Sequence, residues 1–209
     1  MELLINRAAA DAPTLVLAHG AGAPMDSDFL QRLSELLCQR GVNVCRFEFA
    51  YMAERRDGGK KRPPNRQPEL IAAWQMALEQ ARQGFTGPVF IGGKSMGGRM
   101  AAVLAAASPV PGVVCFGYPF HPPAKSEKLR VDTLKQLPCE ALVVQGTRDK
   151  LGNKQEVDGY NLPATIALHW LEDGDHDLKP RVRSGYTHDQ HIVTAAQAAA
   201  DFMARVSQP

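Results

Sequence analysis

Short apolar runs alternate with helix-periodic stretches along almost the whole chain, and this alternation restricts the fold more than any other feature. Six runs rich in β-branched and aromatic residues are predicted strands, with ELLI near the N-terminus as a candidate seventh: 14–18, 42–47, 88–91, 113–116, 141–145 and 165–171. Apolar residues at helical spacing lie between them, around 29–37, 70–81 and 192–203. Because such strands are joined by right-handed crossovers, we expect an α/β fold: a mostly parallel sheet of six or seven strands with helices on both faces.

The length and composition fit one globular domain over residues 1–209. Of these residues 44% are hydrophobic and 22% are charged, which excludes a disordered, collagen-like or disulfide-scaffold chain. With 24 Lys and Arg against 22 Asp and Glu, the formal charge is only +2. We therefore do not expect a nucleic acid partner. Nothing in the sequence indicates the oligomeric state.

No stretch of the sequence predicts a membrane protein or a metal protein. The longest run without charged residues, 100–124, contains five prolines, which would break a spanning helix. The opening residues MELLINRAAADAP lack the features of a signal peptide, so we expect a cytoplasmic protein with no membrane partner. The four cysteines form no CxxC pair and are predicted to be buried thiols rather than metal ligands.

A G-x-S-x-G motif follows the predicted strand 88–91, with Gly93, Ser95 and Gly97 at its fixed positions and a helical run after it. A strand that turns directly into a helix strains its middle residue, and the flanking glycines let the two segments approach. The serine hydroxyl is thereby exposed at the top of the sheet. Chance alone would produce about 0.05 such motifs in a chain of this composition. The alternative is a glycine-rich turn or phosphate cradle, but position 89 lacks the glycine of a phosphate loop.

A nucleophilic serine needs an imidazole to take its proton and a carboxylate to orient that imidazole. Asp149 follows the predicted strand 141–145, and His176 follows the strand 165–171. The chain order Ser, Asp, His and the strand-end positions fit a catalytic triad of Ser95, Asp149 and His176. Each acid also has an ordinary interpretation as a turn or helix cap. The DGDHD segment could imitate a calcium loop, but the required continuation is missing.

An oxyanion that develops on the substrate needs preorganised backbone N–H donors. One donor is predicted at Met96, directly after the serine. We assign the other to Ala21 in the HGAG segment after the first firm strand, with Gly22 as the alternative.

The remaining histidines have weaker functional interpretations. His188 and His191 have the i, i+3 spacing of a helical metal pair, but no third ligand is evident, so a solvated helix start is favoured. His121 is a candidate pocket residue in the link 118–137, although an ordinary loop role is favoured. His169 lies inside a predicted strand.

The segments HGAG, GGKSMGGRMA, QGTRD and DGDHD together resemble the α/β-hydrolase superfamily. More narrowly, the chain is similar to a small capless branch close to dienelactone hydrolases, which includes bacterial hydrolases of unassigned substrate and the hydrolase-like domain of a eukaryotic chromatin-complex subunit. The likeness runs from about residue 13 to 203. It implies an α/β-hydrolase fold, the triad Ser95, Asp149 and His176, and oxyanion donors at Ala21 and Met96. Dienelactone hydrolases carry cysteine as the nucleophile, so the serine is a departure that argues against their substrate.

These features predict a serine hydrolase that acts through an acyl-enzyme on a small-molecule carboxylic ester or thioester, without a metal or organic cofactor. The alternative is a non-catalytic binding or scaffold protein that keeps the fold; peptidase action would use the same machinery. The link 118–137 is too short for a full lid, which predicts an open site for small acyl groups.

Further substrate-binding candidates surround the motif: Gly22, Lys94, Arg99 and His121. The basic segment 55–66 is most simply a solvated loop. A sharper hypothesis is that it draws anionic substrates to the site together with Lys94 and Arg99.

Overall fold

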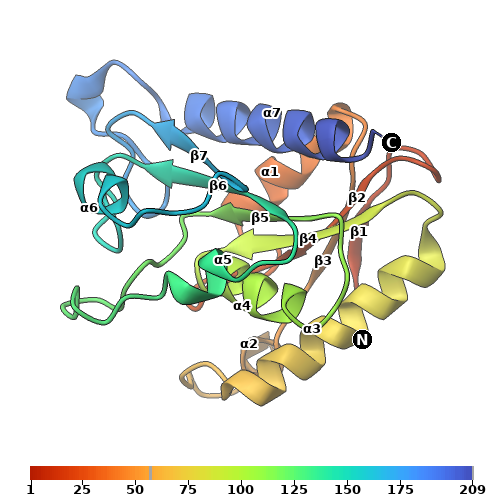
Figure 1. Ribbon diagram of the computed structural model, residues 1–209. Helices are drawn as coiled ribbons and strands as arrows, with labels where there is room; N and C mark the ends of the chain where they lie inside the picture. The colour runs from red at the N-terminus through yellow and green to blue at the C-terminus, as the bar shows by residue number, and fades with distance from the viewer. Residues whose placement is uncertain (57, 209) are drawn as a thin grey trace.

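The computed structural model describes residues 1–56 and 58–208, and within them seven strands form one twisted sheet (Figure 1). The strands are β1 (Leu4–Asn6), β2 (Thr14–Ala18), β3 (Asn43–Phe47), β4 (Val89–Lys94), β5 (Gly112–Phe116), β6 (Glu140–Gly146) and β7 (Ile166–Leu171). Their spatial order is β1-β3-β2-β4-β5-β6-β7. Only β1 runs antiparallel to its neighbour, so the predicted mostly parallel sheet is confirmed.

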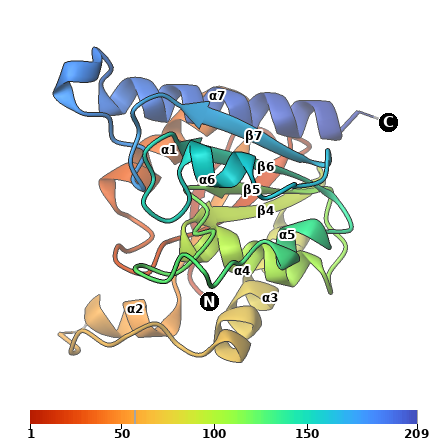
Figure 2. The same cartoon turned by 60° about the vertical axis from the view of Figure 1, so that its left-hand side comes forward.

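Helices cover both faces of the sheet. The helical elements are α1 (Asp28–Gln39), α2 (Ala50–Arg56), α3 (Gln67–Gly84), α4 (Met96–Ala105), α5 (Asp132–Lys135), α6 (Lys154–Asp158), the 3-10 turn η1 (Val182–Ser184) and α7 (His188–Val206). Figure 2 shows α1 and α7 on one side of the sheet and α3 and α4 on the other. None of the helices in the described part of the chain is long and apolar enough to cross a membrane.

The strands are apolar on both faces because each face has its own helical layer. Along β2, Leu15 and Leu17 belong to the core under α1 and α7, whereas Val16 and Ala18 belong to the core under α3 and α4. Alternate residues of a strand point to opposite faces, so the sequence of a strand that is buried on both faces is a continuous apolar run. This is why the strands could be recognised in the sequence.

The segments 51–68 and 118–137, in which the sequence predicts no strand or helix, each contain a short helix. Residues 50–56 form α2, whose Tyr51 and Met52 are buried. Seven residues are too few to display a helical period, so the sequence pattern does not reveal this helix. Within the link 118–137, the four-residue α5 is the regular element that the structure describes.

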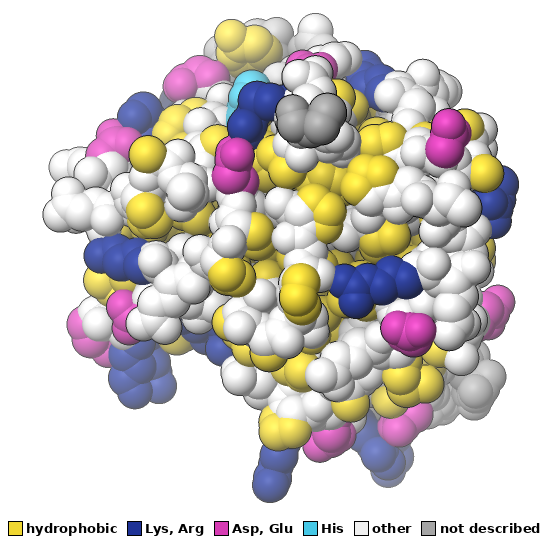
Figure 3. Space-filling model, turned by 45° about the vertical axis from the view of Figure 1, so that its right-hand side comes forward, with side chains coloured by type: hydrophobic (Ala, Val, Ile, Leu, Met, Phe, Trp, Pro, Cys, Tyr) yellow, Lys and Arg dark blue, Asp and Glu magenta, His cyan; other side chains and the backbone are white. Residues whose placement is uncertain are grey.

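All four cysteines are free thiols. Cys45 and Cys115 are buried, and burial raises the pKa of these thiols to about 11 and about 12, respectively. Cys38 and Cys139 are half-buried, so the prediction of buried thiols is confirmed fully for two of the four. On the face shown in Figure 3, acidic and basic side chains are interspersed rather than gathered by sign, in line with the balanced charge.

Candidate active site

Ser95 occupies the sharp turn between β4 and α4. Its backbone has φ 52° and ψ −115°, a conformation that a residue with a side chain rarely adopts. Its N–H donates to the carbonyl of Phe116 on the neighbouring strand at 3.0 Å, which fixes the turn to the sheet. The structure therefore has the strained serine that the motif predicts, with its side chain half-buried and at the edge of a pocket.

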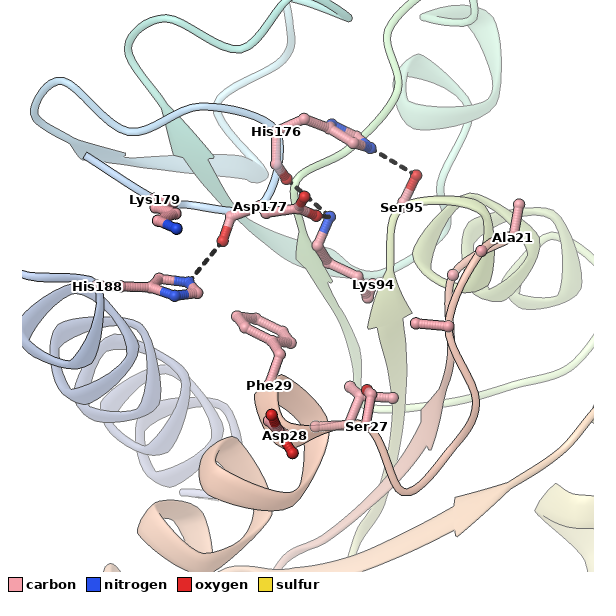
Figure 4. A pocket seen from close by; sticks show the side chains of 14 residues that line it. Ala21, Ser27, Asp28, Phe29, Lys94, Ser95, His176, Asp177, Lys179 and His188 are labelled. Carbon is pink, nitrogen blue, oxygen red and sulfur yellow. Dashed lines mark hydrogen bonds and ion pairs between the residues drawn. The ribbon is translucent and has the colours of Figure 1, made fainter. Parts of the chain in front are cut away.

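Ser95, His176 and Asp149 lie in one hydrogen-bonded chain. The Ser95 hydroxyl is 2.8 Å from Nε2 of His176, and Nδ1 of His176 is 2.8 Å from Oδ2 of Asp149 (Figure 4 shows the first contact). An ionised carboxylate can only accept, so Nδ1 carries the proton and Nε2 is free to accept from the serine. Asp149 is fully buried, whereas His176 is partly open to the pocket. This is the arrangement that can activate a serine.

Both oxygens of Asp149 are held by donors. Gln145 Nε2 donates to Oδ2 at 2.9 Å, and the Leu151 N–H donates to Oδ1 at 2.8 Å. The same Gln145 amide also donates to the carbonyl of Gly152 at 3.0 Å, so its orientation is fixed. Sequence reasoning missed Gln145, although a polar residue that ends an apolar strand run is a signal that could have identified it.

The loop that carries His176 is fixed by acidic side chains with different partners. Asp173 is paired with Arg148 and Arg181, and the Arg181 guanidinium holds the pKa of Asp173 well below its usual range. Asp175 accepts from backbone N–H groups of its own turn, and Asp177 faces a buried lysine. The three carboxylates do not converge, and no metal-binding cluster is found in residues 1–56 and 58–208.

Lys94 is that buried lysine, and its ammonium bridges the serine strand and the histidine loop. Its Nζ donates to the carbonyl of His176 at 2.7 Å and lies 3.1 Å from Oδ1 of Asp177 (Figure 4). Burial lowers the pKa of Lys94, and Asp177 acts in the opposite direction. A Cβ at Gly117 would lie 2.7 Å from the His176 carbonyl and 3.3 Å from Nζ, so glycine is needed there. Lys94 lines the pocket, but its charge is already engaged.

The loop after β2 lies against the serine. A Cβ at Gly20 would lie 3.6 Å from the Cβ of Ser95, and Ala21, Gly22 and Ala23 line the pocket in front of it. Met96 is the first residue of α4. The predicted oxyanion positions Ala21 and Met96 therefore flank Ser95 from two different elements (Figure 4 labels Ala21).

A pocket of about 710 Å³ opens beside Ser95 and His176. On its far side the Phe29 and His188 rings are stacked, with centroids 6.2 Å apart, and His188 Nε2 is 2.9 Å from the carbonyl of Asp177. Lys179 lies at the same end. These residues were not predicted, because they come from α1, α7 and the histidine loop, which only the fold brings together.

The other predicted binding residues lie elsewhere. Neither Arg99 nor His121 is among the described residues that line this pocket, so the pocket lends no support to a substrate role for them. His121 is buried, with Nδ1 at 3.0 Å from its neighbour's carbonyl. The prediction of a solvated helix start is wrong for His191, which is buried and contacts the carbonyl of Leu178 at 2.8 Å. The reason is that α7 packs its first turn onto the histidine loop.

Three of the six cations in the basic segment 55–66, the arginines 55, 56 and 62, make local contacts. Arg56 pairs with Glu48 at 2.5 Å and Asp26 at 2.8 Å, and Arg62 pairs with Glu54 at 3.3 Å. Position 57 lies outside the described residues; of the others in the segment, none lines the pocket of Ser95. The contacts favour the simpler interpretation of a solvated surface segment.

Comparisons with known proteins agree with this fold. A family model described as Alpha/beta hydrolase domain matches residues 11–204. Among solved structures, an α/β serine hydrolase homologue from Coxiella burnetii has a TM-score of 0.69 at 15% identity, covering 97% of this chain and 89% of that one. A serine hydrolase without a lid from Xanthomonas campestris has a TM-score of 0.69 at 17% identity, covering 97% and 87%.

A dienelactone hydrolase from Anabaena variabilis is also similar, with a TM-score of 0.70 at 19% identity and coverage of 95% of this chain and 88% of that one. At such identities the solved structures establish the fold alone: an α/β-hydrolase fold with a short link in place of a lid, as predicted. The family model covers nearly the whole chain, and the protein therefore belongs to the α/β hydrolase domain family.

Proposed function

We propose that this protein is a serine hydrolase that cleaves a small carboxylic ester or thioester through an acyl-enzyme on Ser95. The proposal depends on two hydrogen bonds of His176. Its Nε2 is 2.8 Å from Ser95 Oγ, and its Nδ1 is 2.8 Å from Asp149 Oδ2. The proposal is supported by the strained backbone of Ser95, which presents the hydroxyl at the mouth of a pocket.

In the proposed reaction, Ser95 Oγ attacks the substrate carbonyl carbon as His176 Nε2 takes the hydroxyl proton. Asp149 keeps the imidazole in the required tautomer, and the N–H groups of Ala21 and Met96 donate to the oxyanion. Collapse breaks the bond to the alcohol or thiol, which leaves with the proton from His176. Water then attacks the acyl group and gives its proton to His176. Collapse breaks the bond between the acyl carbon and Ser95 Oγ, which takes that proton back from His176 as the carboxylic acid is released.

The form of the pocket supports a small acyl group. Glycines and alanines, Gly20 to Ala23, form the wall next to Ser95, and the link 118–137 contributes only the four-residue α5 rather than a cap domain. A long acyl chain would stay largely in water in such a site and would contribute little binding energy.

The test is the intact mass of the protein after treatment with a fluorophosphonate, for the parent and for Ser95→Ala. We expect one adduct on the parent and none on the variant at the same short exposure, since an activated serine reacts much faster than other nucleophiles and Ser95→Ala lacks that hydroxyl. A folded parent that remains unlabelled would contradict the proposal and favour the non-catalytic binding alternative.

Replacing Lys94 by Met should lower kcat for a short ester by about tenfold. The Lys94 ammonium joins the His176 carbonyl to the Asp177 carboxylate, and without it the histidine loop is no longer fixed to the serine strand. Nε2 of His176 would then be less well placed to accept from Ser95. The measurement is kcat together with the thermal midpoint. Lys154→Met, on the exposed α6, is the matched control, and a parental kcat in folded Lys94→Met would contradict this role.

A further inference from the structure

The loop that presents the proposed oxyanion donors is held by two buried side chains rather than by backbone bonding. Apart from helix and strand ladders, no backbone–backbone hydrogen bond in the described part of the chain involves residues 20–23. The hydroxyl of Tyr51 on α2 instead shares its single proton between the carbonyl of Gly20 at 3.3 Å and that of Ala21 at 3.2 Å. His19 Nδ1 is 2.7 Å from the same Gly20 carbonyl.

The tautomer of His19 follows from its second contact. The Phe49 N–H donates to Nε2 of His19 at 3.1 Å, so Nε2 is the acceptor and Nδ1 carries the proton. Burial lowers the pKa of His19, which keeps the ring neutral. Nδ1 therefore donates to the Gly20 carbonyl, and this oxygen has a second donor in Tyr51.

These carbonyl contacts decide where the amide groups of the loop point. In a trans peptide the C=O and the N–H point in opposite directions, and no cis peptide is found in the described residues. Because the Gly20 carbonyl points toward the Tyr51 hydroxyl, the Ala21 N–H of the same peptide group points away from Tyr51. The Ala21 carbonyl also points toward Tyr51, so the Gly22 N–H points away from it as well. Both residues line the pocket beside Ser95.

We propose that Tyr51 is a positioning residue, whose hydroxyl holds these two peptide groups so that the amide of Ala21, the donor that acts with Met96, faces the oxyanion with the Gly22 amide beside it. The inference rests on the proposed function and concerns how its transition state is stabilised. Burial raises the pKa of Tyr51 to about 12, so the hydroxyl remains a donor at neutral pH.

The position of Tyr51 is itself well fixed. Its side chain is buried, and the Arg55 guanidinium lies 5.2 Å from the ring centroid. The backbone N–H of Tyr51 donates to Asn65 Oδ1 at 3.0 Å. The donor is therefore preorganised, as a contact that orients an oxyanion hole must be. His19 reaches only the Gly20 carbonyl, so within the described part of the chain Tyr51 is the side chain found to donate to the Ala21 carbonyl.

The experiment compares Tyr51→Phe with the parent, using a short ester, a fluorophosphonate and a trifluoromethyl ketone that forms a tetrahedral adduct with serine. We expect kcat, the labelling rate and the ketone affinity each to fall about tenfold, less than when a donor is deleted, because the amides remain but are no longer held. KM and the pH limbs should not change, since the triad is untouched. Each rate is divided by the amount of protein that carries the fluorophosphonate when labelling is complete. A smaller folded fraction in the variant therefore cannot be mistaken for a lower rate.

Tyr118→Phe is the matched control, because Tyr118 is equally buried and its hydroxyl donates to a backbone carbonyl, that of Arg130, at 2.9 Å. Its kcat should equal that of the parent. If Tyr51→Phe keeps the parent's kcat and ketone affinity, Tyr51 serves packing only and the inference is overturned. The proposed function would then still stand, because it fails only if the parent itself is not labelled at Ser95.

Discussion

Asp149→Asn is expected to lower kcat by about four orders of magnitude. In the parent, Oδ2 accepts from both His176 and Gln145, and Oδ1 accepts from the Leu151 N–H. An asparagine has one acceptor oxygen in place of two. If its NH₂ replaces Oδ2, it lies against the Gln145 amide donor. It also donates to Nδ1 of His176, so the ring proton moves to Nε2, which then cannot accept from serine. If it replaces Oδ1, it meets the Leu151 N–H, and the neutral amide no longer stabilises the imidazolium that forms during the attack.

Either orientation leaves two donors facing each other in a fully buried site, which costs about 1–3 kcal/mol. The variant should therefore melt a few degrees lower than the parent but stay folded at 25 °C. The measurement is kcat for a short ester together with the thermal midpoint. Asp158→Asn, whose acid pairs with Lys154 on the surface of α6, is the matched control and should keep full activity. More than a tenth of parental kcat in folded Asp149→Asn would show that this acid does not orient His176.

The elements of the fold could be predicted because each carries a local signal. The strands β2, β4, β5 and β6 are apolar on both faces, and the helices α1, α3 and α7 show one apolar stripe. Ser95, Asp149 and His176 were identifiable because each stands in the turn or loop that follows a strand of a parallel sheet, where the topology brings carboxyl ends together. Their hydrogen-bonded geometry agrees with that expectation, and their catalytic roles remain a proposal.

What could not be predicted depends on contacts between distant segments. Nothing near Tyr51 in the sequence indicates that its hydroxyl reaches the loop after β2, some 30 residues earlier. Lys94 looked like a free cation beside the motif, but the histidine loop, 82 residues later, supplies its partners. Phe29 and His188 likewise meet only because α1 and α7 pack together. Such side chains are ordinary in the local pattern, and only tertiary packing assigns them a place.

Gly93→Ala should destabilise the protein by at least about 3 kcal/mol. A Cβ at this position would lie 2.6 Å from the carbonyl carbon of Gly97, 2.7 Å from the carbonyl oxygen of Ala18 and 2.7 Å from the amide nitrogen of Gly98. All three atoms are backbone, so no side chain can rotate to relieve the clash. The helix α4 would have to move away from β2 and β4, and Ser95 would move with it.

For a chain of this size, a loss of 3 kcal/mol corresponds to a fall of about 6–12 °C in the thermal midpoint, which calorimetry would measure. Fluorophosphonate labelling should also slow, because the turn that strains Ser95 depends on the close contact of β4 and α4. Gly84→Ala is the matched control: Gly84 ends α3, its Cβ would have no neighbour within 4 Å, and alanine is the better helix former. Its midpoint should equal or exceed that of the parent. A midpoint for Gly93→Ala within about 2 °C of the parent would mean that the turn tolerates a side chain, and the steric explanation of the G-x-S-x-G spacing would fail here.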